Sequence, residues 1–175
     1  MMKAIFANGC FWCTEAVFQR LKGVENVKSG FTDGDIKNPA YREVVMGKTG
    51  HAEAIQVEYD ESIIDYEVLL YVFFSTHDPT TLNRQGYDVG TQYRSGIFYT
   101  NEKQKLIAET IIDRLNKETF SNKIVTALKP ATEFYEAEAE HQDFYNQNTG
   151  YRYCQLVIEP KLRVLREKFN PYLKS

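Results

Sequence analysis

The chain has 175 residues, a length typical of one domain, and its composition of 43% hydrophobic and 26% charged residues excludes a mainly disordered protein. Its 21 Lys and Arg against 24 Asp and Glu leave a net charge of −3. Nucleic acid is therefore not expected as a partner, because no basic excess exists to neutralise a phosphate backbone. No apolar run approaches the ~18 residues of a membrane span, and the N-terminus reaches Asn8 and Gly9 too soon for a signal-peptide core. We expect a cytoplasmic protein with no membrane attachment.

In the first half of the chain, apolar runs and helical spacing alternate, and Gly, Asp, Asn and Pro separate them. Strict alternation of side chains after His51 is the clearest strand pattern. The predicted elements are a strand at 3–8, a helix at 14–22, a strand at 24–31, a loop at 32–39, a short helix at 41–46, a half-buried strand at 53–59 and a helix at 65–75.

The second half begins with a long segment, 77–94, that has no periodicity and is rich in Asn, Gly, Thr and Gln. A loop of that length in a compact domain is usually functional. The charged stretches 133–140 and 161–168 are interpreted as solvated helix faces. The predicted elements are a strand at 97–99, helices at 102–117 and 138–148, a strand at 155–158 and a terminal helix at 161–169. No linker divides the chain, so we predict one α+β domain over residues 1–175.

The three cysteines, Cys10, Cys13 and Cys154, are the first sign of chemistry. An odd number without an export signal argues against a structural disulfide framework. Cys10 stands between a predicted strand and a helix, where the helix N-terminus lowers the pKa of a thiol and favours the nucleophilic thiolate. Cys13, one turn later, would share that face and could form a disulfide with Cys10. The alternatives are simple packing or a zinc site, although no second Cys-x-x-Cys or His-x3-His pair completes one.

Two further clusters contain polar groups suited to a site. Glu53 starts a strand, and a carboxyl desolvated by aromatic neighbours could keep its proton and act as a general acid. The alternative is a surface Glu, and His51 beside it is typical of a capping or core histidine. The loop at 77–95 suits a substrate wall, or else a surface loop held by Asx turns.

Together these clusters resemble the peptide methionine sulfoxide reductase A family. The resemblance covers roughly residues 4–158 and rests on motifs that follow the family's order and spacing. They are Gly-Cys-Phe-Trp at 9–12, Asn-Pro-x-Tyr at 38–41, Gly-x-Thr-Gly-His-Ala-Glu at 47–53, His-Asp-Pro at 77–79, Gly-Thr-Gln-Tyr-Arg-Ser at 90–95, His-Gln at 141–142 and Tyr-Cys at 153–154. It implies a two-layer α+β sandwich with a mixed sheet and flanking helices on a ferredoxin-like core, which agrees with the alternation of predicted elements.

The resemblance implies thiol-dependent reduction of methionine (S)-sulfoxide, free or in proteins, as repair of oxidative damage. It implies no metal or organic cofactor. The implied catalytic roles are attack on sulfur by Cys10, protonation of the sulfoxide oxygen by Glu53, hydrogen bonds to that oxygen from Tyr41 and Tyr93, and help in substrate binding from Asp88. Phe11 and Trp12 match the aromatic wall that receives the substrate methyl group.

The family also implies that attack leaves Cys10 as a sulfenic acid, which a second thiol converts to a disulfide for reduction by thioredoxin. Cys154 matches a recycling cysteine that many members carry in a mobile, glycine-rich tail, but here a strand-like segment without Gly follows it. Cys13 stands where Gly is commoner and is already close to Cys10, so we expect Cys13 to resolve the sulfenic acid. A relay through both cysteines stays open.

Other features leave room for alternatives. Phe31 and Asp33 stand where the family usually has Tyr and Gly. A thioredoxin-like disulfide oxidoreductase using Cys10 and Cys13, or a zinc-binding interaction module, would also fit the cysteines. Both leave most of the matched motifs unexplained. We expect a monomer.

Overall fold

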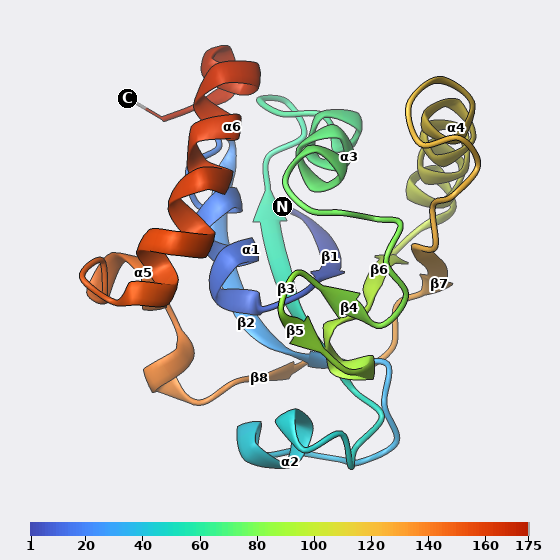
Figure 1. Ribbon diagram of the computed structural model, residues 1–175. Coiled ribbons are helices and arrows are strands. Elements are labelled where there is room, and N and C mark those ends of the chain that lie inside the picture. Colours follow the sequence, from blue (N-terminus) through green and yellow to red (C-terminus); the bar gives the residue numbers. More distant parts are fainter. Residues whose placement is uncertain (175) are drawn as a thin grey trace.

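The computed structural model describes residues 1–174, and a mixed β-sheet runs through its centre (Figure 1). Its strands are β1 (Met2–Asn8), β2 (Val24–Thr32), β3 (Ala52–Tyr59), β6 (Ser95–Tyr99), β7 (Ala127–Pro130) and β8 (Tyr135–Glu136). They lie in the order β7-β6-β1-β3-β2-β8. Only the β6–β7 pair is parallel among these neighbours. The mixed sheet with flanking helices confirms the predicted α+β class.

The strands β1 and β3 form the middle of the sheet because their side chains alternate between two apolar faces. Ala4 and Phe6 of β1 belong to the large core cluster, whereas Ile5 and Ala7 belong to a smaller cluster on the opposite face. Phe6 pairs with Ile55 in the antiparallel register. This register puts the odd-numbered residues of β3 on the side of the large core.

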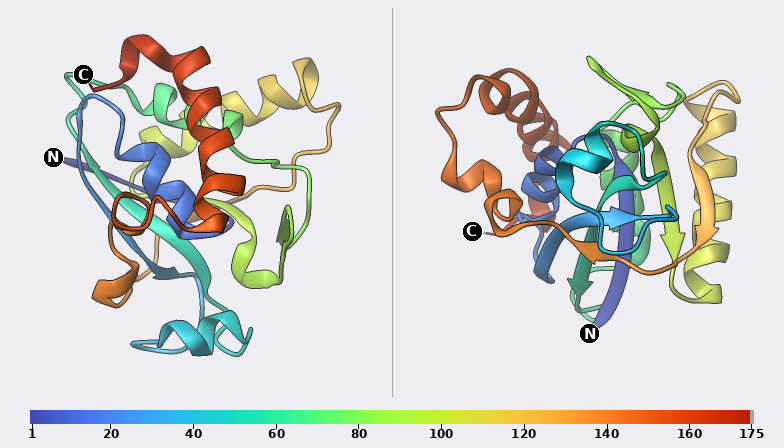
Figure 2. Two further views of the ribbon diagram at one scale, coloured as in Figure 1. Left: turned by 60° about the vertical axis from the view of Figure 1, so that its left-hand side comes forward. Right: turned by 90° about the horizontal axis from the view of Figure 1, so that it is seen from below.

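The helices pack on the large core cluster and form the second layer (Figures 1 and 2). The main ones are α1 (Phe11–Phe18), α3 (Tyr66–Ser75), α4 (Glu102–Glu118) and α6 (Glu159–Phe169). The opposite face of the sheet is covered in part by Ala131 and Phe134 from the segment before β8. The prediction of a two-layer arrangement is confirmed.

Shorter elements lie around the two ends of α1. They are α2 (Tyr41–Val45), the hairpin β4 (Arg84–Gln85) and β5 (Asp88–Val89), the 3₁₀ turns η1 (Thr91–Tyr93), η2 (Ala139–His141) and η4 (Asn170–Tyr172), α5 (Phe144–Gln147) and a π-helical turn η3 (Cys154–Ile158). The C-terminal segment returns to α1, where the N–H of Lys174 donates to the carbonyl of Arg20. Figure 2 shows α5 and α6 beside α1.

Several predicted elements are wrong. The strand predicted at 155–158 is the π turn η3, which runs directly into α6. Pro160 explains the wider turn, because proline has no N–H to continue the regular i→i−4 ladder. The helix predicted at 138–148 is broken into η2 and α5, since Asp143 adopts a left-handed conformation with φ of 55°.

Boundaries and short strands also differ from expectation. The helix predicted at 14–22 begins at Phe11 and ends at Phe18. The stretch 133–140 is no helix, because β8 and η2 lie there. The strands β7 and β8 were not predicted, since each is short and lies at an edge of the sheet. Among residues 1–174, no helix has the length and apolar composition needed to cross a bilayer.

Candidate active site

Cys10 stands at the N-cap of α1, directly after the β1–α1 turn. Its carbonyl accepts hydrogen bonds from the N–H groups of Cys13, at 3.1 Å, and Thr14, at 3.4 Å. The turn needs glycine at position 9, where φ is 107° and an added Cβ would lie 2.9 Å from the side chain of Gln85. The tight turn therefore presents Cys10 at the helix start, with 9% of its surface exposed.

Glu53 reaches the same helix start from β3. One of its oxygens, Oε1, accepts a hydrogen bond of 3.1 Å from the backbone N–H of Phe11. The other, Oε2, is buried and has no hydrogen-bond partner within residues 1–174. Burial raises the pKa of Glu53 to about 8, the Phe11 N–H opposes this, and Asp88 and Cys13 raise it further. At neutral pH the structure thus holds a protonated carboxylic acid beside Cys10.

Two tyrosine hydroxyls share the electrostatic surroundings of Glu53. Tyr41 comes from α2 and Tyr93 from η1, and both are half-buried. Burial raises the pKa of Tyr41 and of Tyr93, and Glu53, Cys10 and Asp88 raise both further. Both hydroxyls therefore keep their protons and are able to donate hydrogen bonds.

Aromatic rings form a stack next to Cys10. Trp12 lies flat on Phe144, with ring centroids 3.8 Å apart and an angle of 7° between the planes. Its Nε1 donates to Nδ1 of His141 at 3.2 Å, and Tyr41 stacks on the same imidazole at 4.0 Å. Phe11, in contrast, is fully buried and packs against the ring of Tyr41 with centroids 5.9 Å apart. Trp12 is thus the more accessible of the two predicted wall residues.

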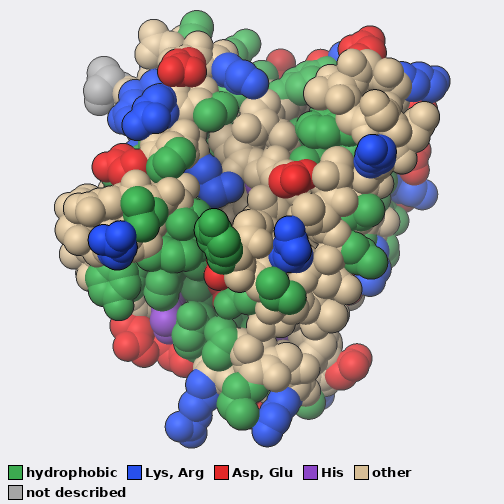
Figure 3. Space-filling view, viewed as in Figure 1, with side chains coloured by type: hydrophobic (Ala, Val, Ile, Leu, Met, Phe, Trp, Pro, Cys, Tyr) green, Lys and Arg blue, Asp and Glu red, His purple; other side chains and the backbone are tan. Residues whose placement is uncertain are grey.

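On its other side, Cys10 borders a cavity of about 410 Å³ that also contains Cys13. The hydroxyl of Tyr153 donates to Oδ2 of Asp88 at 2.8 Å and lies 3.5 Å from Sγ of Cys13. The remaining wall is mostly apolar and comes from the β4–β5 hairpin and the η3–α6 segment. Figure 3 shows hydrophobic side chains gathered between these two parts of the molecule. Cys10 therefore stands at the helix start that Glu53 contacts and also lines this cavity.

The expectation that the helix start lowers the pKa of Cys10 is wrong for this pocket. Burial raises the pKa of the Cys10 thiol well above its usual value, and the hydrogen bond to Cys13 and the charges of Cys13 and Glu53 add to this. The pKa of Cys13 is lowered instead, chiefly by its hydrogen bond with Cys10 and also by the charge of Lys161. Of the two thiols, Cys13 therefore loses its proton more readily than Cys10.

Cys154 is not among the residues that line the cavity containing Cys10 and Cys13. Its side chain is fully buried in the large core cluster at the start of η3, and burial raises its pKa. All three cysteines are free thiols. Cys154 directly follows Tyr153, and the hydroxyl of Tyr153 contacts Cys13. The side chain of Tyr153 therefore links the backbone next to Cys154 with Cys13.

The histidines outside the aromatic stack hold loops. His51 accepts a hydrogen bond from the Gly34 N–H at 2.9 Å, as expected for a capping or core residue. Burial lowers the pKa of His77 to about 3, so this ring is neutral where it contacts Ser95. Among the described residues, no group of three or more His, Cys, Asp or Glu side chains could hold a metal ion.

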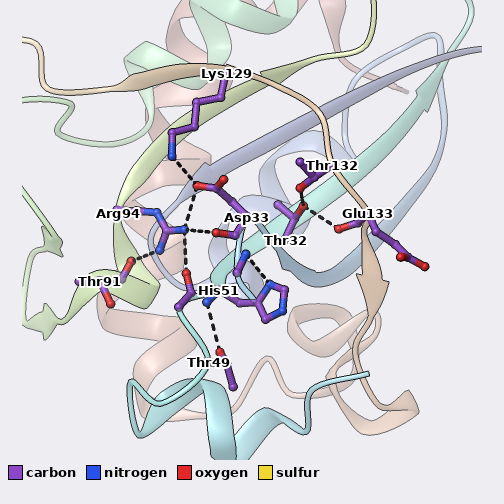
Figure 4. A network of polar contacts seen from close by, with 11 residues as sticks. Thr32, Asp33, Thr49, His51, Thr91, Arg94, Lys129, Thr132 and Glu133 are labelled. Atoms are coloured by element: carbon purple, nitrogen blue, oxygen red, sulfur yellow. Dashed lines mark hydrogen bonds and ion pairs between the residues drawn. The ribbon is translucent and has the colours of Figure 1, made fainter. Parts of the chain in front are cut away.

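A polar network fixes the loop that carries Tyr93 (Figure 4). The guanidinium of Arg94 donates to Oδ2 of Asp33 at 3.0 Å and to the carbonyls of Thr91 and Gly50. Lys129 makes a second ion pair with the Asp33 carboxylate at 3.1 Å. The loop at 90–95 is thus tied to the ends of β2 and β3, which sets the place of Tyr93.

Several residues that surround Cys10 and Cys13 were not predicted from the sequence to belong to the site. His141 and Tyr153 belong to matched motifs, but nothing in their pattern assigned them a contact. Phe144 and Lys161 had no motif, and Lys161 was interpreted as part of a solvated helix face. In the structure Lys161 lines the cavity beside Cys13, so that interpretation is wrong for this residue.

Comparison with known proteins now decides the family. The peptide methionine sulfoxide reductase family model matches residues 2–172. The chain belongs to that family. This confirms the resemblance and the class of enzyme, an oxidoreductase, that the motifs predicted.

Individual relatives agree with this membership. "Peptide methionine sulfoxide reductase MsrA" of Psychrobacter cryohalolentis is 51% identical over 175 residues, which is 100% of both chains. The reduced form of Mxr1 from Saccharomyces cerevisiae has a TM-score of 0.81 at 34% identity, over 86% of this chain and 87% of that one. Mxr1 in complex with Trx2 has a TM-score of 0.58 at 27% identity, over 82% and 84%.

Proposed function

We propose that this chain reduces the S epimer of methionine sulfoxide, free or in proteins, to methionine at the expense of thiols. One observation carries the proposal: Glu53 is a buried carboxylic acid with a pKa of about 8 and an oxygen without a partner, next to Cys10. A sulfoxide sulfur is a poor electrophile, because its oxygen is a poor leaving group. A neutral acid that protonates this oxygen relieves the charge that develops there.

Each residue near Cys10 then has a role. The Cys10 sulfur attacks the sulfoxide sulfur, Glu53 gives its proton to the oxygen, and the hydroxyls of Tyr41 and Tyr93 donate hydrogen bonds to it. Asp88 acts from the other side of Cys10, where it contributes to substrate binding through water. Methionine leaves, and Cys10 becomes a sulfenic acid.

The aromatic stack supplies the preference for one epimer. The methyl group of the substrate lies against Trp12, which Phe144 and His141 hold in place. Phe11 supports this wall from the core. With the methyl group fixed, only one configuration at sulfur directs its oxygen to Glu53.

Cys13 resolves the sulfenic acid in this proposal. It lies in one cavity with Cys10 and has the lower pKa of the pair, whereas Cys154 is fully buried in the core. The resulting Cys10–Cys13 disulfide is reduced by thioredoxin through thiol–disulfide exchange. The likeness to Mxr1 in complex with Trx2 supports that reductant. We further propose that the enzyme is a cytoplasmic monomer that repairs oxidised methionine.

The deciding experiment is the turnover of resolved S and R epimers of a methionine-sulfoxide peptide with dithiothreitol, with Cys10→Ser as the inactive control. Consumption of the S epimer alone is expected. Consumption of neither epimer by the folded protein contradicts the proposal and favours a disulfide oxidoreductase. With thioredoxin as reductant, Cys13→Ser should lose turnover but still release one methionine per chain, and turnover at the wild-type rate would exclude Cys13 as the resolving residue.

A further inference from the structure

A partly buried lysine lies on the wall of the cavity that contains Cys10 and Cys13. Lys161 is the third residue of α6, and Asp88 and Tyr153 line the same cavity. Its Nζ donates a hydrogen bond of 2.5 Å to the carbonyl of Thr76, at the C-terminal end of α3. Within residues 1–174, no carboxylate oxygen lies within 4.0 Å of this ammonium group. An ammonium has three N–H donors, so the Thr76 carbonyl satisfies only one of them.

The local fold places this lysine on the cavity wall. The π turn η3 is followed at once by Glu159 and Pro160, and helical turns of this kind are frequent at functional sites. Leu156 and Val157 of the same turn line the cavity as well. A wall of apolar side chains lowers the local dielectric, so the charge of Lys161 acts on its neighbours more strongly than it would in water.

We propose that Lys161 is a positioning residue that keeps Cys13 as a thiolate, so that Cys13 can accept the Cys10 proton and later attack the Cys10 sulfenic acid. This inference rests on the proposed function, in which Cys13 is the resolving cysteine. Lys161 touches neither substrate nor the reacting sulfoxide in this account. It acts through Cys13.

The charges around Cys13 agree with this role. The hydrogen bond with Cys10 lowers the pKa of Cys13 most, burial opposes it, and the charge of Lys161 lowers it further, while Asp88 raises it. Burial lowers the pKa of Lys161, but the charges of Cys13, Cys10 and Asp88 oppose this. The ammonium and the thiolate therefore stabilise each other's charged form.

The steps balance if the resting enzyme has protons on Cys10 and Glu53 and a thiolate at Cys13. As the Cys10 sulfur attacks the sulfoxide sulfur, Cys13 accepts the Cys10 proton and Glu53 protonates the oxygen. The attack forms a bond between the Cys10 sulfur and the substrate sulfur. The protonated oxygen then moves from the substrate sulfur to the Cys10 sulfur as the bond between the two sulfurs breaks, so methionine leaves with two additional electrons and Cys10 becomes S–OH. Glu53 then takes the proton from Cys13, and the Cys13 thiolate attacks Cys10. The S–S bond forms, the S–O bond breaks, and hydroxide leaves as water with the Glu53 proton.

The test measures the ionisation of Cys13 directly. In the Cys10→Ser protein, the rate of Cys13 alkylation by iodoacetamide is followed against pH, with the modified site identified by mass spectrometry. Lys161→Gln retains an N–H donor but removes the charge, Lys161→Met retains only the length of the side chain, and Lys161→Arg retains the charge. Lys168→Gln removes a charge from the exposed face of the same helix and serves as the matched control.

Lys161→Gln or Lys161→Met is expected to move the midpoint upward by about one pH unit, which makes alkylation roughly tenfold slower below the midpoint. Lys161→Arg and Lys168→Gln should leave the midpoint unchanged. An unchanged midpoint in whichever neutral variant folds overturns the inference. Alkylation needs no substrate, so this result is separate from the proposed function, which fails instead if the wild-type chain releases no methionine from one equivalent of sulfoxide.

In the otherwise unmodified enzyme, quenched single turnovers give the second readout. Lys161→Gln should slow the formation of the Cys10–Cys13 disulfide at pH 7 about tenfold, and more than it lowers the yield of methionine. The slower rate should recover as the pH rises above the new midpoint. A lysine that only caps α3 would lower stability without changing this pH profile, and that outcome also overturns the inference.

Discussion

Two buried carboxyls lie near the first turns of α1, Glu15 within the helix and Glu53 at its start, and they differ in how many hydrogen bonds they accept. Glu15 is 2% exposed, and its two oxygens accept hydrogen bonds from the backbone N–H groups of Asp143, at 3.0 Å, and Phe144, at 3.3 Å. Glu53 is 1% exposed, but only Oε1 has a donor, the Phe11 N–H. The two carboxyls are similarly buried, but only Glu15 has a hydrogen-bond donor for each of its oxygens.

This difference separates an anchoring carboxyl from one suited to chemistry. Burial raises the pKa of Glu15 to about 7, and its two N–H donors oppose the rise. Glu53 has one such donor, and its pKa rises to about 8. A buried oxygen without a partner is costly in a folded protein. A substrate oxygen that accepts the Glu53 proton would satisfy the missing hydrogen bond.

The largest expected effect comes from Glu53→Gln. The amide can still accept from the Phe11 N–H, but it has no proton to give to a sulfoxide. We expect kcat/KM for the S epimer to fall by about 10²–10⁴, the usual range for a lost general acid, with the thermal midpoint at pH 7 not lowered. Steady-state kinetics and thermal unfolding on the same sample check both. Retention of more than a tenth of wild-type kcat/KM would exclude Glu53 as the acid.

The second prediction is that Glu15→Gln, unlike Glu53→Gln, mainly lowers stability. In Glu15→Gln, an amide NH₂ faces one of the two backbone N–H groups, so one buried donor loses its acceptor. We expect the free energy of unfolding to drop by about 1–3 kcal/mol, as measured by urea denaturation. KM should rise more than kcat falls, because Phe144 supports Trp12. A fall in kcat as large as that of Glu53→Gln would mean that Glu15 is no mere anchor.

Sequence motifs point to Glu53 as a candidate acid, but no motif points to Glu15. Alternation in β3 puts position 53 on the same face as Ile55 and Val57, and the family motif ends at this residue. Glu15 gave no such signal, because its partners are backbone groups of Asp143 and Phe144, more than 120 residues away. A contact to a backbone N–H does not require a particular residue type at the donor position. Such an anchor can therefore be identified only from the folded structure.

The same limit explains the errors near the C-terminus. The mostly apolar residues 155–158 are compatible with a short strand as well as with a helical turn. Only the packing of α6 against the core decides between the two. The spacing of Lys161 predicts a surface charge on a solvated helix face. In the fold, Lys161 lines the cavity between η3 and the β4–β5 hairpin. No local sequence pattern predicts this cavity, because it forms between segments that lie far apart in the chain.

A third prediction concerns pH. The folded pKa of Glu53, about 8, lies above the ordinary value of 4.5, so folding favours its protonated form. This contribution to stability is complete below pH 4.5 and is lost as the pH rises through 8. Between pH 6 and 9 we expect the wild-type chain to lose about 2–3 kcal/mol more than Glu53→Gln, because glutamine does not ionise. Urea unfolding at both pH values measures this, and parallel losses would show that Glu53 is already ionised at pH 6.

The smallest expected effect comes from a carboxylate whose neighbours are cations. Asp33 has 15% of its side chain exposed and pairs with Arg94 and Lys129, and its φ of 68° lies in the left-handed region. Asn tolerates that backbone conformation, so Asp33→Asn removes the charge with little strain. We expect a loss of about 0.5–1 kcal/mol in the free energy of unfolding, since partly exposed ion pairs contribute little.

The exposed pair of Asp113 and Lys117 provides the matched control for that change, because 67% and 70% of these side chains are exposed. Asp113→Asn should cost no more than about 0.5 kcal/mol. The two variants should differ in activity as well, because the Arg94 network holds the loop of Tyr93 and the Asp113 pair lies on α4. If Asp33→Asn leaves KM unchanged while Glu15→Gln raises it, anchoring of the aromatic stack matters more to substrate binding than anchoring of the tyrosine loop. If instead Asp33→Asn raises KM and Glu15→Gln does not, the contacts at the ends of β2 and β3 matter more to substrate binding than those of α1.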